Sequence, residues 1–169
     1  MYMKKIYLDN AAGTAVRKEV LQEMVPYFSE KYANPSALHD AGLEVKKEIA
    51  TVRSTIMNQL SCDSVIFTSG GTESINLALQ GILTKGDHII TTTIEHKAVL
   101  ETCRYLENKG VQITYLAVDS DGLVNVDAVV KALKKKTKLV SIQYVNNETG
   151  VIQPIQKIAK KLEGKNVLF

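Results

Sequence analysis

Apolar side chains along the chain follow two different spacings. Short uninterrupted apolar runs are typical of buried strands, whereas apolar residues that recur every three or four positions indicate one face of a helix. The runs predict strands at 65–67, 88–93, 111–118 and 139–145. The helical spacing predicts helices after Thr14, from about Ala41 to Leu60, from Thr72 to Leu83, around 99–106 and up to Gly110, from Asn125, and around 155–162. Pro26 should divide the first helix, because proline lacks a backbone donor and crowds the preceding turn.

The order of these elements predicts an α/β fold. Strand and helix take turns from residue 65 onward, an alternation that is typical of a largely parallel sheet flanked by helices. Residues 165–169 resemble the start of another buried strand, and parallel strands are normally covered on both faces. We therefore expect the chain to be a fragment or one half of a two-chain protein.

A glycine-rich turn separates the predicted strand at 65–67 from the helix that follows it. The first N–H groups of a helix have no internal partner and carry the positive end of its dipole. Gly70 and Gly71 allow a tight turn and let the backbone approach a ligand, and Thr72 adds a hydroxyl. Phosphate suits such a turn. A capped turn without a ligand is the alternative, because the run matches neither G-x-G-x-x-G nor G-x-x-x-x-G-K-[ST].

Composition and charge exclude several classes of function. The 169 residues are 45% hydrophobic and 23% charged, as in globular proteins, and the net charge is +3. The basic side chains cluster near one helix end, where they complement the helix dipole, so we expect no nucleic-acid partner. No apolar run approaches the roughly 20 residues that cross a bilayer, so no membrane role is expected. The clustered lysines are Lys131, Lys134, Lys135, Lys136 and Lys138.

Polar residues directly follow three of the predicted strands. They are the glycine turn, Glu95-His96 and Asn146-Asn147, and ligands of open α/β sheets bind at the carboxyl ends of the strands. An imidazole can stack on a ring and titrates near neutrality, and an amide can donate without changing charge. By themselves, His96 also fits a helix N-terminal residue with a satisfied ring, and Asn147 fits a turn residue.

Histidine and cysteine give no sign of a metal or redox centre. His88 has no carboxylate or cysteine at ligand spacing, so we expect no metal site. The two cysteines, Cys62 and Cys103, form no C-x-x-C motif and fit a reducing cytoplasm. Cys103 lies on an apolar helical face and is expected in the core, whereas Cys62 lies in a more exposed helix-terminal turn.

Five short motifs occur in a single order along the chain. They are Tyr7-Leu8-Asp9-Asn10-Ala11-Ala12, Asn34-Pro35-Ser36 with His39 and Gly42, Thr68-Ser69-Gly70-Gly71-Thr72-Glu73, Glu95-His96-Lys97-Ala98-Val99, and Val145-Asn146-Asn147-Glu148-Thr149-Gly150. Together they resemble the N-terminal half of the cysteine desulfurases, pyridoxal-phosphate enzymes that supply sulphur for iron–sulphur clusters. The resemblance covers essentially all 169 residues.

The resemblance implies a fold, a cofactor and roles for individual residues. The fold is the N-terminal part of the pyridoxal-phosphate-dependent transferase fold type I, and the cofactor is pyridoxal 5'-phosphate. Gly71 and Thr72 would hold its phosphate, His96 would stack over its ring and move protons, and Asn147 would bond its phenolic oxygen. Residues 1–14 would pack with the small domain of the family, and residues 15–169 would begin the large cofactor-binding domain and stop within a strand.

The chain departs from the family pattern in two ways. Gly13 stands where relatives commonly carry threonine, and the typical family member is more than twice as long. The resemblance places the lysine that binds the cofactor, its aspartate partner, the persulfide cysteine and the substrate-binding arginine beyond Phe169. Neither Cys62 nor Cys103 matches that persulfide cysteine. We therefore expect this chain alone to be inactive.

Three functions remain open. The first is the N-terminal half of a cysteine desulfurase that converts L-cysteine to L-alanine, works as a cytoplasmic homodimer in its complete form, and passes sulphur to an iron–sulphur scaffold or another acceptor. A related pyridoxal-phosphate enzyme such as selenocysteine lyase is a close variant. The second is a non-catalytic module that binds a partner or a separately encoded C-terminal chain. The third is a nucleotide-binding domain, which the lack of a Rossmann or Walker motif disfavours.

Overall fold

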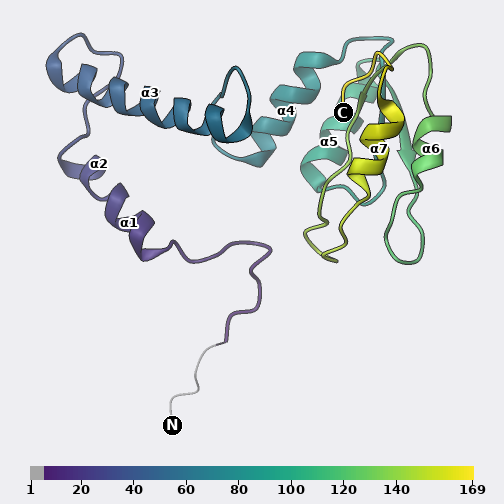
Figure 1. The fold of residues 1–169 in the computed structure, drawn as a ribbon, viewed down its shortest axis with the longest axis horizontal. Helices are drawn as coiled ribbons and strands as arrows, with labels where there is room; N and C mark the ends of the chain where they lie inside the picture. Colours follow the sequence, from purple (N-terminus) through teal and green to yellow (C-terminus); the bar gives the residue numbers. More distant parts are fainter. Residues whose placement is uncertain (1–5) are drawn as a thin grey trace. The chain divides into compact units, whose positions relative to one another are not determined.

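The computed structural model of the protein describes residues 6–169 (Figure 1). The chain forms two compact units, one that ends at Phe67 and one that begins at Thr68. The predicted α/β core lies in the second unit, and the first contains only helices and loops among its described residues. Among residues 6–169, no helix is both long and apolar enough to cross a membrane.

The helices of the first unit begin and end where the sequence predicts. Helix α1 (Lys18–Met24) stops before Pro26, and α2 (Pro26–Ser29) starts on that proline, so the predicted division is confirmed. Helix α3 (Asp40–Leu60) begins after His39, whose Nδ1 accepts a hydrogen bond from Gly42 N–H at 3.2 Å. Gly42 itself is required by close packing, since a Cβ there would lie 2.7 Å from two carbonyl oxygens of the preceding loop.

The second unit is built on a three-stranded parallel sheet. Its order is β2 (Gln112–Leu116), β1 (His88–Thr92) and β3 (Thr137–Val140). Every residue of β1 is buried, as expected for a central parallel strand covered on both faces. Four helices accompany the sheet, namely α4 (Gly71–Ile82), α5 (Lys97–Asn108), α6 (Val126–Lys131) and α7 (Ile155–Leu162).

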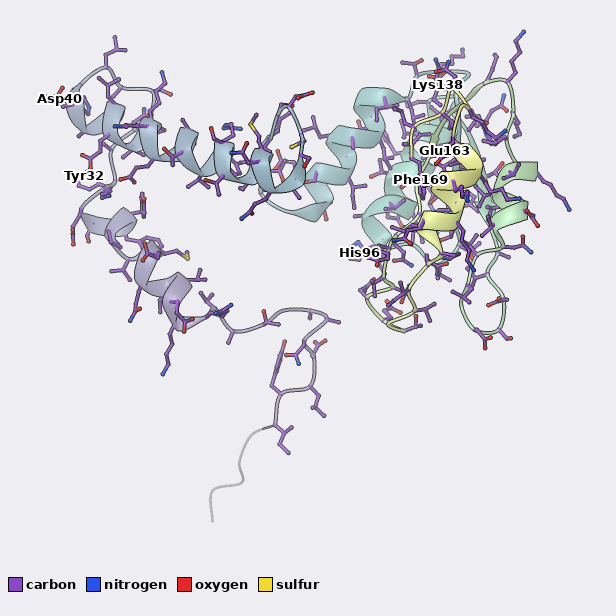
Figure 2. All side chains as sticks on the ribbon, viewed as in Figure 1. Tyr32, Asp40, His96, Lys138, Glu163 and Phe169 are labelled. Atoms are coloured by element: carbon purple, nitrogen blue, oxygen red, sulfur yellow. The ribbon has the colours of Figure 1, made fainter. Side chains whose placement is uncertain are left out.

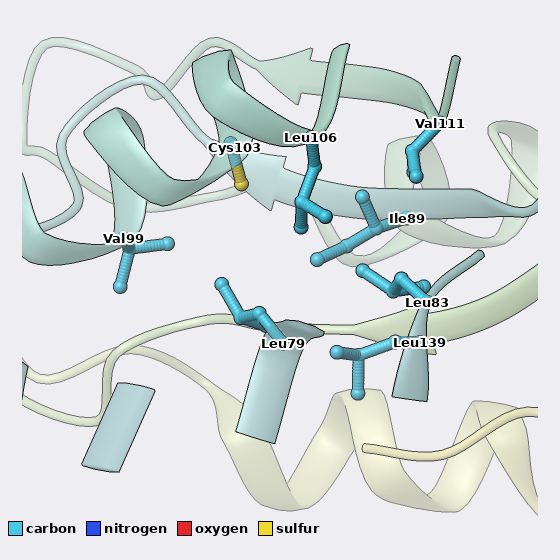
Figure 3. Close-up of a cluster of buried hydrophobic side chains, with 8 residues drawn as sticks. All are labelled: Leu79, Leu83, Ile89, Val99, Cys103, Leu106, Val111 and Leu139. Carbon is cyan, nitrogen blue, oxygen red and sulfur yellow. The ribbon is translucent and has the colours of Figure 1, made fainter. Parts of the chain in front are cut away.

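Two hydrophobic clusters form the core of this unit. Consecutive strand residues point to opposite faces of a sheet, so Ile89 joins one cluster and Ile90 joins the other. The first cluster packs α4 and α5 against the sheet (Figure 3) and includes Cys103, as predicted. The second packs α6 and α7 through Val129 and Ile158. The largely parallel α/β architecture expected from the sequence is therefore confirmed.

Two predicted strands differ from the structure. Residues 65–67 form no strand, and Ile66 and Phe67 are 70% and 49% exposed, because this run finds no strand to pair with among the described residues. The strand predicted at 139–145 begins earlier, at Thr137, and ends at Val140. Its pairing with β1 stops after Ser141 N–H donates to the Ile90 carbonyl, since the Gln143 N–H turns to the Glu95 carboxylate instead.

The end of the chain pairs with β3, as the apolar run at 165–169 suggested. Leu168 accepts from Val140 N–H at 2.8 Å and donates to the Lys138 carbonyl at 2.9 Å, in parallel orientation. Only this isolated bridge forms, so the predicted strand is shorter than expected. The helix predicted from Asn125 is confirmed as α6, and Asn125 caps it, because its Oδ1 accepts from Ala128 N–H at 3.0 Å.

His88 ties the three strands together at their amino ends. Its ring is fully buried, with Nδ1 2.8 Å from Thr137 Oγ1 and Nε2 2.8 Å from Thr114 Oγ1. Thr137 Oγ1 also accepts from Lys134 N–H, so every donor is used if Thr137 O–H donates to Nδ1 and Nε2–H donates to Thr114. This arrangement requires a neutral ring. Burial, together with the nearby Lys134, lowers the pKa of His88.

We predict that His88 makes the fold less stable in mild acid. The unfolded chain takes up a proton near the usual histidine pKa of about 6.5, whereas folded His88 stays neutral, so stability is lost as pH falls below that value. Between about pH 7.5 and about pH 5.5 the loss from this one group is at most about 1.4 kcal/mol. Urea unfolding of wild type and His88→Gln at both pH values measures it. An equal pH dependence in the two proteins would contradict the assignment.

Candidate functional site

The carboxyl edge of the sheet brings together the segments that the sequence singled out in the second unit. A groove of about 620 Å³ lies between α4 and α5, and its lining includes Thr72 and His96. A cavity of about 450 Å³ lies between the turn after β1 and the loop after β3, and its lining includes His96 and Asn147. We call these the α4–α5 groove and the β1–β3 cavity. His96 lines both, so three of the four predicted site residues border adjoining spaces.

This edge is well separated from the opposite end of the sheet. In Figure 2, His96 lies after the end of β1, and Lys138 lies near the start of β3 at the other end of the same unit. The separation follows from the parallel strands, which all point their carboxyl ends the same way.

The glycine turn presents unpaired backbone donors. Helix α4 begins at Gly71, one residue before the predicted start, and the first helical bond runs from Ser74 N–H to the Gly70 carbonyl at 3.1 Å. No side chain caps this end, and the N–H groups of Gly71, Thr72 and Glu73 have no partner in the part of the chain that the structure describes. These groups form the positive end of the helix dipole.

Neither glycine of the turn is required by the packing of the described chain. Gly70 has an extended backbone, and a Cβ built on Gly70 or on Gly71 would meet no atom within 4 Å. The space around each of these Cβ positions is therefore open. A side chain at residue 71 would extend into open space rather than collide with the protein.

Side chains around the turn brace it without filling it. Glu73 Oε2 accepts from both the backbone N–H and the hydroxyl of Ser69 at 2.6 Å, which lowers the pKa of Glu73. Thr68 Oγ1 lies 2.7 Å from Ser74 Oγ. The hydroxyl of Thr72, in contrast, bonds to no other described residue. Thr72 is therefore the one hydroxyl of this turn that is free to bind a ligand among residues 6–169.

His96 is both a helix cap and a lining residue. Its Nδ1 accepts a hydrogen bond from Ala98 N–H at 3.0 Å and caps α5, so the helix N-terminal role considered from the sequence is confirmed. A nitrogen that accepts this bond carries no proton, so the neutral ring carries its proton on Nε2. His96 is exposed, and Nε2 has no partner within the described chain.

Asn146 and Asn147 have different environments although they are adjacent. Asn146 is 6% exposed, and its amide donates to the Ile94 carbonyl while its oxygen accepts from the N–H groups of Glu148 and Thr149. Asn147 is exposed, and its side chain bonds to no described residue. Asn146 therefore shapes the loop, and Asn147 is available to a ligand.

Glu95 is a buried carboxylate that sequence reasoning missed as a site residue. It is 6% exposed and accepts hydrogen bonds from Thr92 Oγ1 at 2.7 Å and from Gln143 N–H at 3.1 and 3.2 Å. Burial raises the pKa of Glu95, although these bonds act in the opposite direction. The sequence gives little sign that Glu95 is buried, because its partner Gln143 is 48 residues away and only the fold brings the two together.

The described residues contain no candidate metal centre and no reactive thiol at this edge. No group of three or more histidine, cysteine or acidic side chains is placed to hold a metal ion among residues 6–169. Burial raises the pKa of Cys103 to about 11, so its thiol stays protonated in the core. Cys62 is half-buried in the first unit, and its Sγ lies 3.4 Å from the Ser64 carbonyl oxygen.

Curated relatives match the chain along almost its whole length. A protein named cysteine desulfurase IscS from Dictyoglomus turgidum is 46% identical over 172 residues, which cover 98% of this chain and 44% of that relative. A protein named putative cysteine desulfurase IscS 1 from Bacillus subtilis is 44% identical over 173 residues. The match covers 99% of this chain and 46% of that relative. The chain thus spans about 44% of the length of the first of these relatives.

Solved structures share the fold and confirm the fold class predicted from the sequence. A NifS-like protein superimposes with a TM-score of 0.91 and 38% identity, covering 98% of this chain and 48% of that one. A cysteine desulfurase from Thermococcus onnurineus superimposes with a TM-score of 0.85 and 27% identity, covering 97% and 42%. The Aminotransferase class-V family pattern matches residues 6–169. The chain therefore belongs to the class-V aminotransferase family, and its similarity to the cysteine desulfurases is confirmed.

Proposed function

We propose that this chain is the N-terminal part of a cysteine desulfurase, which converts L-cysteine to L-alanine and transfers the sulphur to an enzyme cysteine as a persulfide for iron–sulphur cluster assembly. One observation carries the proposal. Thr72, His96 and Asn147 border adjoining spaces at the carboxyl edge of a chain that is 46% identical to a protein named cysteine desulfurase. The same fold with a different substrate, as in selenocysteine lyase, is the alternative within this class.

The described residues fit pyridoxal 5'-phosphate in charge, space and donors. The unpaired N–H groups of Gly71 and Thr72 suit a phosphate, and the space in front of them is open where Gly71 lacks a Cβ. Glu73 adds a negative charge nearby, but two bonds from Ser69 engage it. The exposed ring of His96 and the free amide of Asn147 suit a flat aromatic ring with a phenolic oxygen.

Each of these residues has a definite task in the proposed enzyme. Bound pyridoxal 5'-phosphate supplies an aromatic ring that takes up electrons released at the substrate Cα. Gly71 and Thr72 hold the phosphate, and Asn147 donates its amide to the phenolic oxygen. His96 covers the ring and moves protons. While Nδ1 accepts the hydrogen bond from Ala98 N–H, the proton of the neutral ring is on Nε2. For Nε2 to accept a proton, the ring proton must first be on Nδ1, which breaks the cap of α5.

The proposed enzyme also needs groups that the 169 residues do not supply. The lysine that binds the cofactor, the aspartate at the ring nitrogen and the persulfide cysteine are supplied by a C-terminal part or a complementary chain. Of the proposed segment 1–14, which packs with a small domain in the family, residues 1–5 lie outside the described residues; residues 15–169 belong to the large domain. The complete protein is a cytoplasmic homodimer that passes sulphur to an iron–sulphur scaffold or another acceptor.

Reconstitution tests the proposed function. Purified chain is mixed with pyridoxal 5'-phosphate and L-cysteine, with and without a chain that carries the C-terminal segments of a related desulfurase, and alanine is measured. We expect turnover with the complement and no alanine from the chain alone, because the described lysines are exposed or, for Lys31, paired with Glu48, so none is fixed in a buried site suited to a defined bond with the cofactor. Turnover by the chain alone would contradict the proposal. Binding of the complement without turnover would favour the non-catalytic module, and turnover of selenocysteine alone would favour a lyase.

The phosphate role of the glycine turn gives a second prediction. Gly71→Val should weaken cofactor binding in the reconstituted protein, because the new side chain fills the open space in front of α4. Thr72→Val should cost about 1.5 to 3 kcal/mol of binding, the usual value for a hydrogen bond to a charged group. Equilibrium dialysis measures both.

The matched control for Thr72→Val is Thr55→Val. The substitution Thr55→Val removes a threonine hydroxyl from α3. That hydroxyl donates only to the Thr51 carbonyl, at 3.0 Å. The cofactor affinity of this variant should equal that of wild type. Wild-type affinity in both Gly71→Val and Thr72→Val would remove these residues from the phosphate site.

The two tasks of His96 can be separated by a pair of substitutions. His96→Asn should keep the α5 cap, since asparagine is among the best capping residues, while losing the imidazole. We expect unchanged stability and a turnover rate in the reconstituted enzyme that is roughly 100- to 10,000-fold lower, as for a lost acid–base group. His96→Ala should lose the same activity and also about 0.5 to 2 kcal/mol of stability.

Asn125→Ala provides the control for the lost cap. It removes a bond of the same kind at α6, so it should lower stability without slowing turnover. Normal turnover by His96→Asn would show that His96 serves only as a cap.

A further inference from the structure

A buried polar cluster joins the two segments that carry His96 and Asn147. Glu95 binds Gln143 N–H, the Gln143 side-chain amide donates to the Ile94 carbonyl at 2.9 Å, and the Asn146 amide donates to the same carbonyl at 3.0 Å. These partners are 48 to 52 residues apart in the sequence. The turn after β1 is thereby tied to the loop after β3.

The cost of burying this cluster indicates a specific role. A charged carboxylate in the interior is costly unless it is paired or fully hydrogen-bonded. Glu95 forms no ion pair in the part of the chain that the structure describes, and its partners are one hydroxyl and one backbone N–H. An apolar side chain would fill the same place at less cost, so a polar one is expected where it fixes the position of something else.

The cluster alternates buried and exposed residues at both of its ends. Buried Glu95 directly precedes exposed His96, and buried Asn146 directly precedes exposed Asn147. His96 and Asn147 both line the β1–β3 cavity, together with Glu95 and Asn146. Each residue available to a ligand therefore directly follows a buried neighbour whose side chain is hydrogen-bonded within the protein.

We infer that Glu95 is a positioning residue, which fixes His96 relative to Asn147 by binding the Gln143 backbone and so tying the turn after β1 to the loop after β3. This inference deepens the proposed function and rests on it where turnover is concerned. The bond itself can be tested on the 169-residue chain without any cofactor. Two substitutions at Glu95 separate the shape of the side chain from its hydrogen bonds.

Glu95→Ala removes the acceptor, whereas Glu95→Gln keeps one. The bonds from Thr92 Oγ1 and from Gln143 N–H both reach Oε1, so a glutamine oxygen can accept both, but the NH2 group that replaces Oε2 cannot accept the second Gln143 contact at 3.2 Å. Val129→Ala is the control for a general loss of stability, because Val129 is a fully buried residue of α6 and belongs to the second hydrophobic cluster. None of the polar residues of the Glu95 cluster named above belongs to that hydrophobic cluster.

The first measurement is amide hydrogen exchange by NMR in the chain alone. Gln143 N–H reports the Glu95 bond, and Ile90 in the centre of β1 reports unfolding of the whole unit. In Glu95→Ala the ratio of the Gln143 rate to the Ile90 rate should rise about 10- to 100-fold, the effect of losing a hydrogen bond to a charged group. In Val129→Ala it should stay within about threefold of wild type, and in Glu95→Gln it should rise less than in Glu95→Ala, because one acceptor oxygen is kept. An unchanged ratio in Glu95→Ala would overturn the inference.

The second measurement is turnover of L-cysteine by the reconstituted enzyme. Glu95→Ala should lower kcat at least about 10-fold with little change in KM, since small displacements of reacting groups are costly, and Glu95→Gln should recover most of it. An equal loss in Val129→Ala, or no loss in Glu95→Ala, would show a structural role alone and overturn the inference. Absence of turnover in wild type would refute the proposed function instead, and the exchange ratios would then decide whether Glu95 ties the two segments.

Discussion

The parallel pairing of β1 with both of its neighbours is the constraint on which the rest of the second unit depends. Because β1 is buried on both faces, it separates the two hydrophobic clusters and sets the side on which each helix packs. Because all three strands run the same way, the segments that follow β1 and β3 meet at one edge. Polar side chains hold both ends of this strand. His88 bonds across the sheet at its start, and Glu95 does so just after its end.

The site follows from that arrangement with little additional structure. The β1–α5 turn must leave the sheet and start a helix, and His96 caps that helix while its Nε2 remains free. The loop after β3 must reverse direction, and Asn146 provides the bonds for this reversal so that Asn147 is left exposed. The glycine turn adds the open end of α4. The ligand-accessible groups are thus the free Nε2 of a capping residue, an exposed amide beside a loop-shaping one, and the uncapped N–H groups of a helix.

The sequence predicted those features that depend on neighbouring residues. The spacing of Val99, Cys103 and Leu106 gave α5 and its buried face, and Asn125 and Pro26 marked helix boundaries, because caps and proline act within one turn. The strand expected at 65–67 is wrong, because an apolar run becomes a strand only where a partner is available. The early end of β3 and the burial of Glu95 could not be predicted from the sequence for a similar reason. Both depend on a bond between residues 48 positions apart.

We propose that the turn at Gly71 and Thr72 binds the phosphate of pyridoxal 5'-phosphate at the edge where His96 and Asn147 lie. A crystal structure of the chain assembled with a complementary C-terminal part and the cofactor tests this most directly. We expect phosphate oxygens within about 3 Å of the Gly71 and Thr72 N–H groups, the usual hydrogen-bond distance, with the His96 ring against the pyridine. A cofactor bound elsewhere, with the N–H groups at the start of α4 left in solvent, would contradict it.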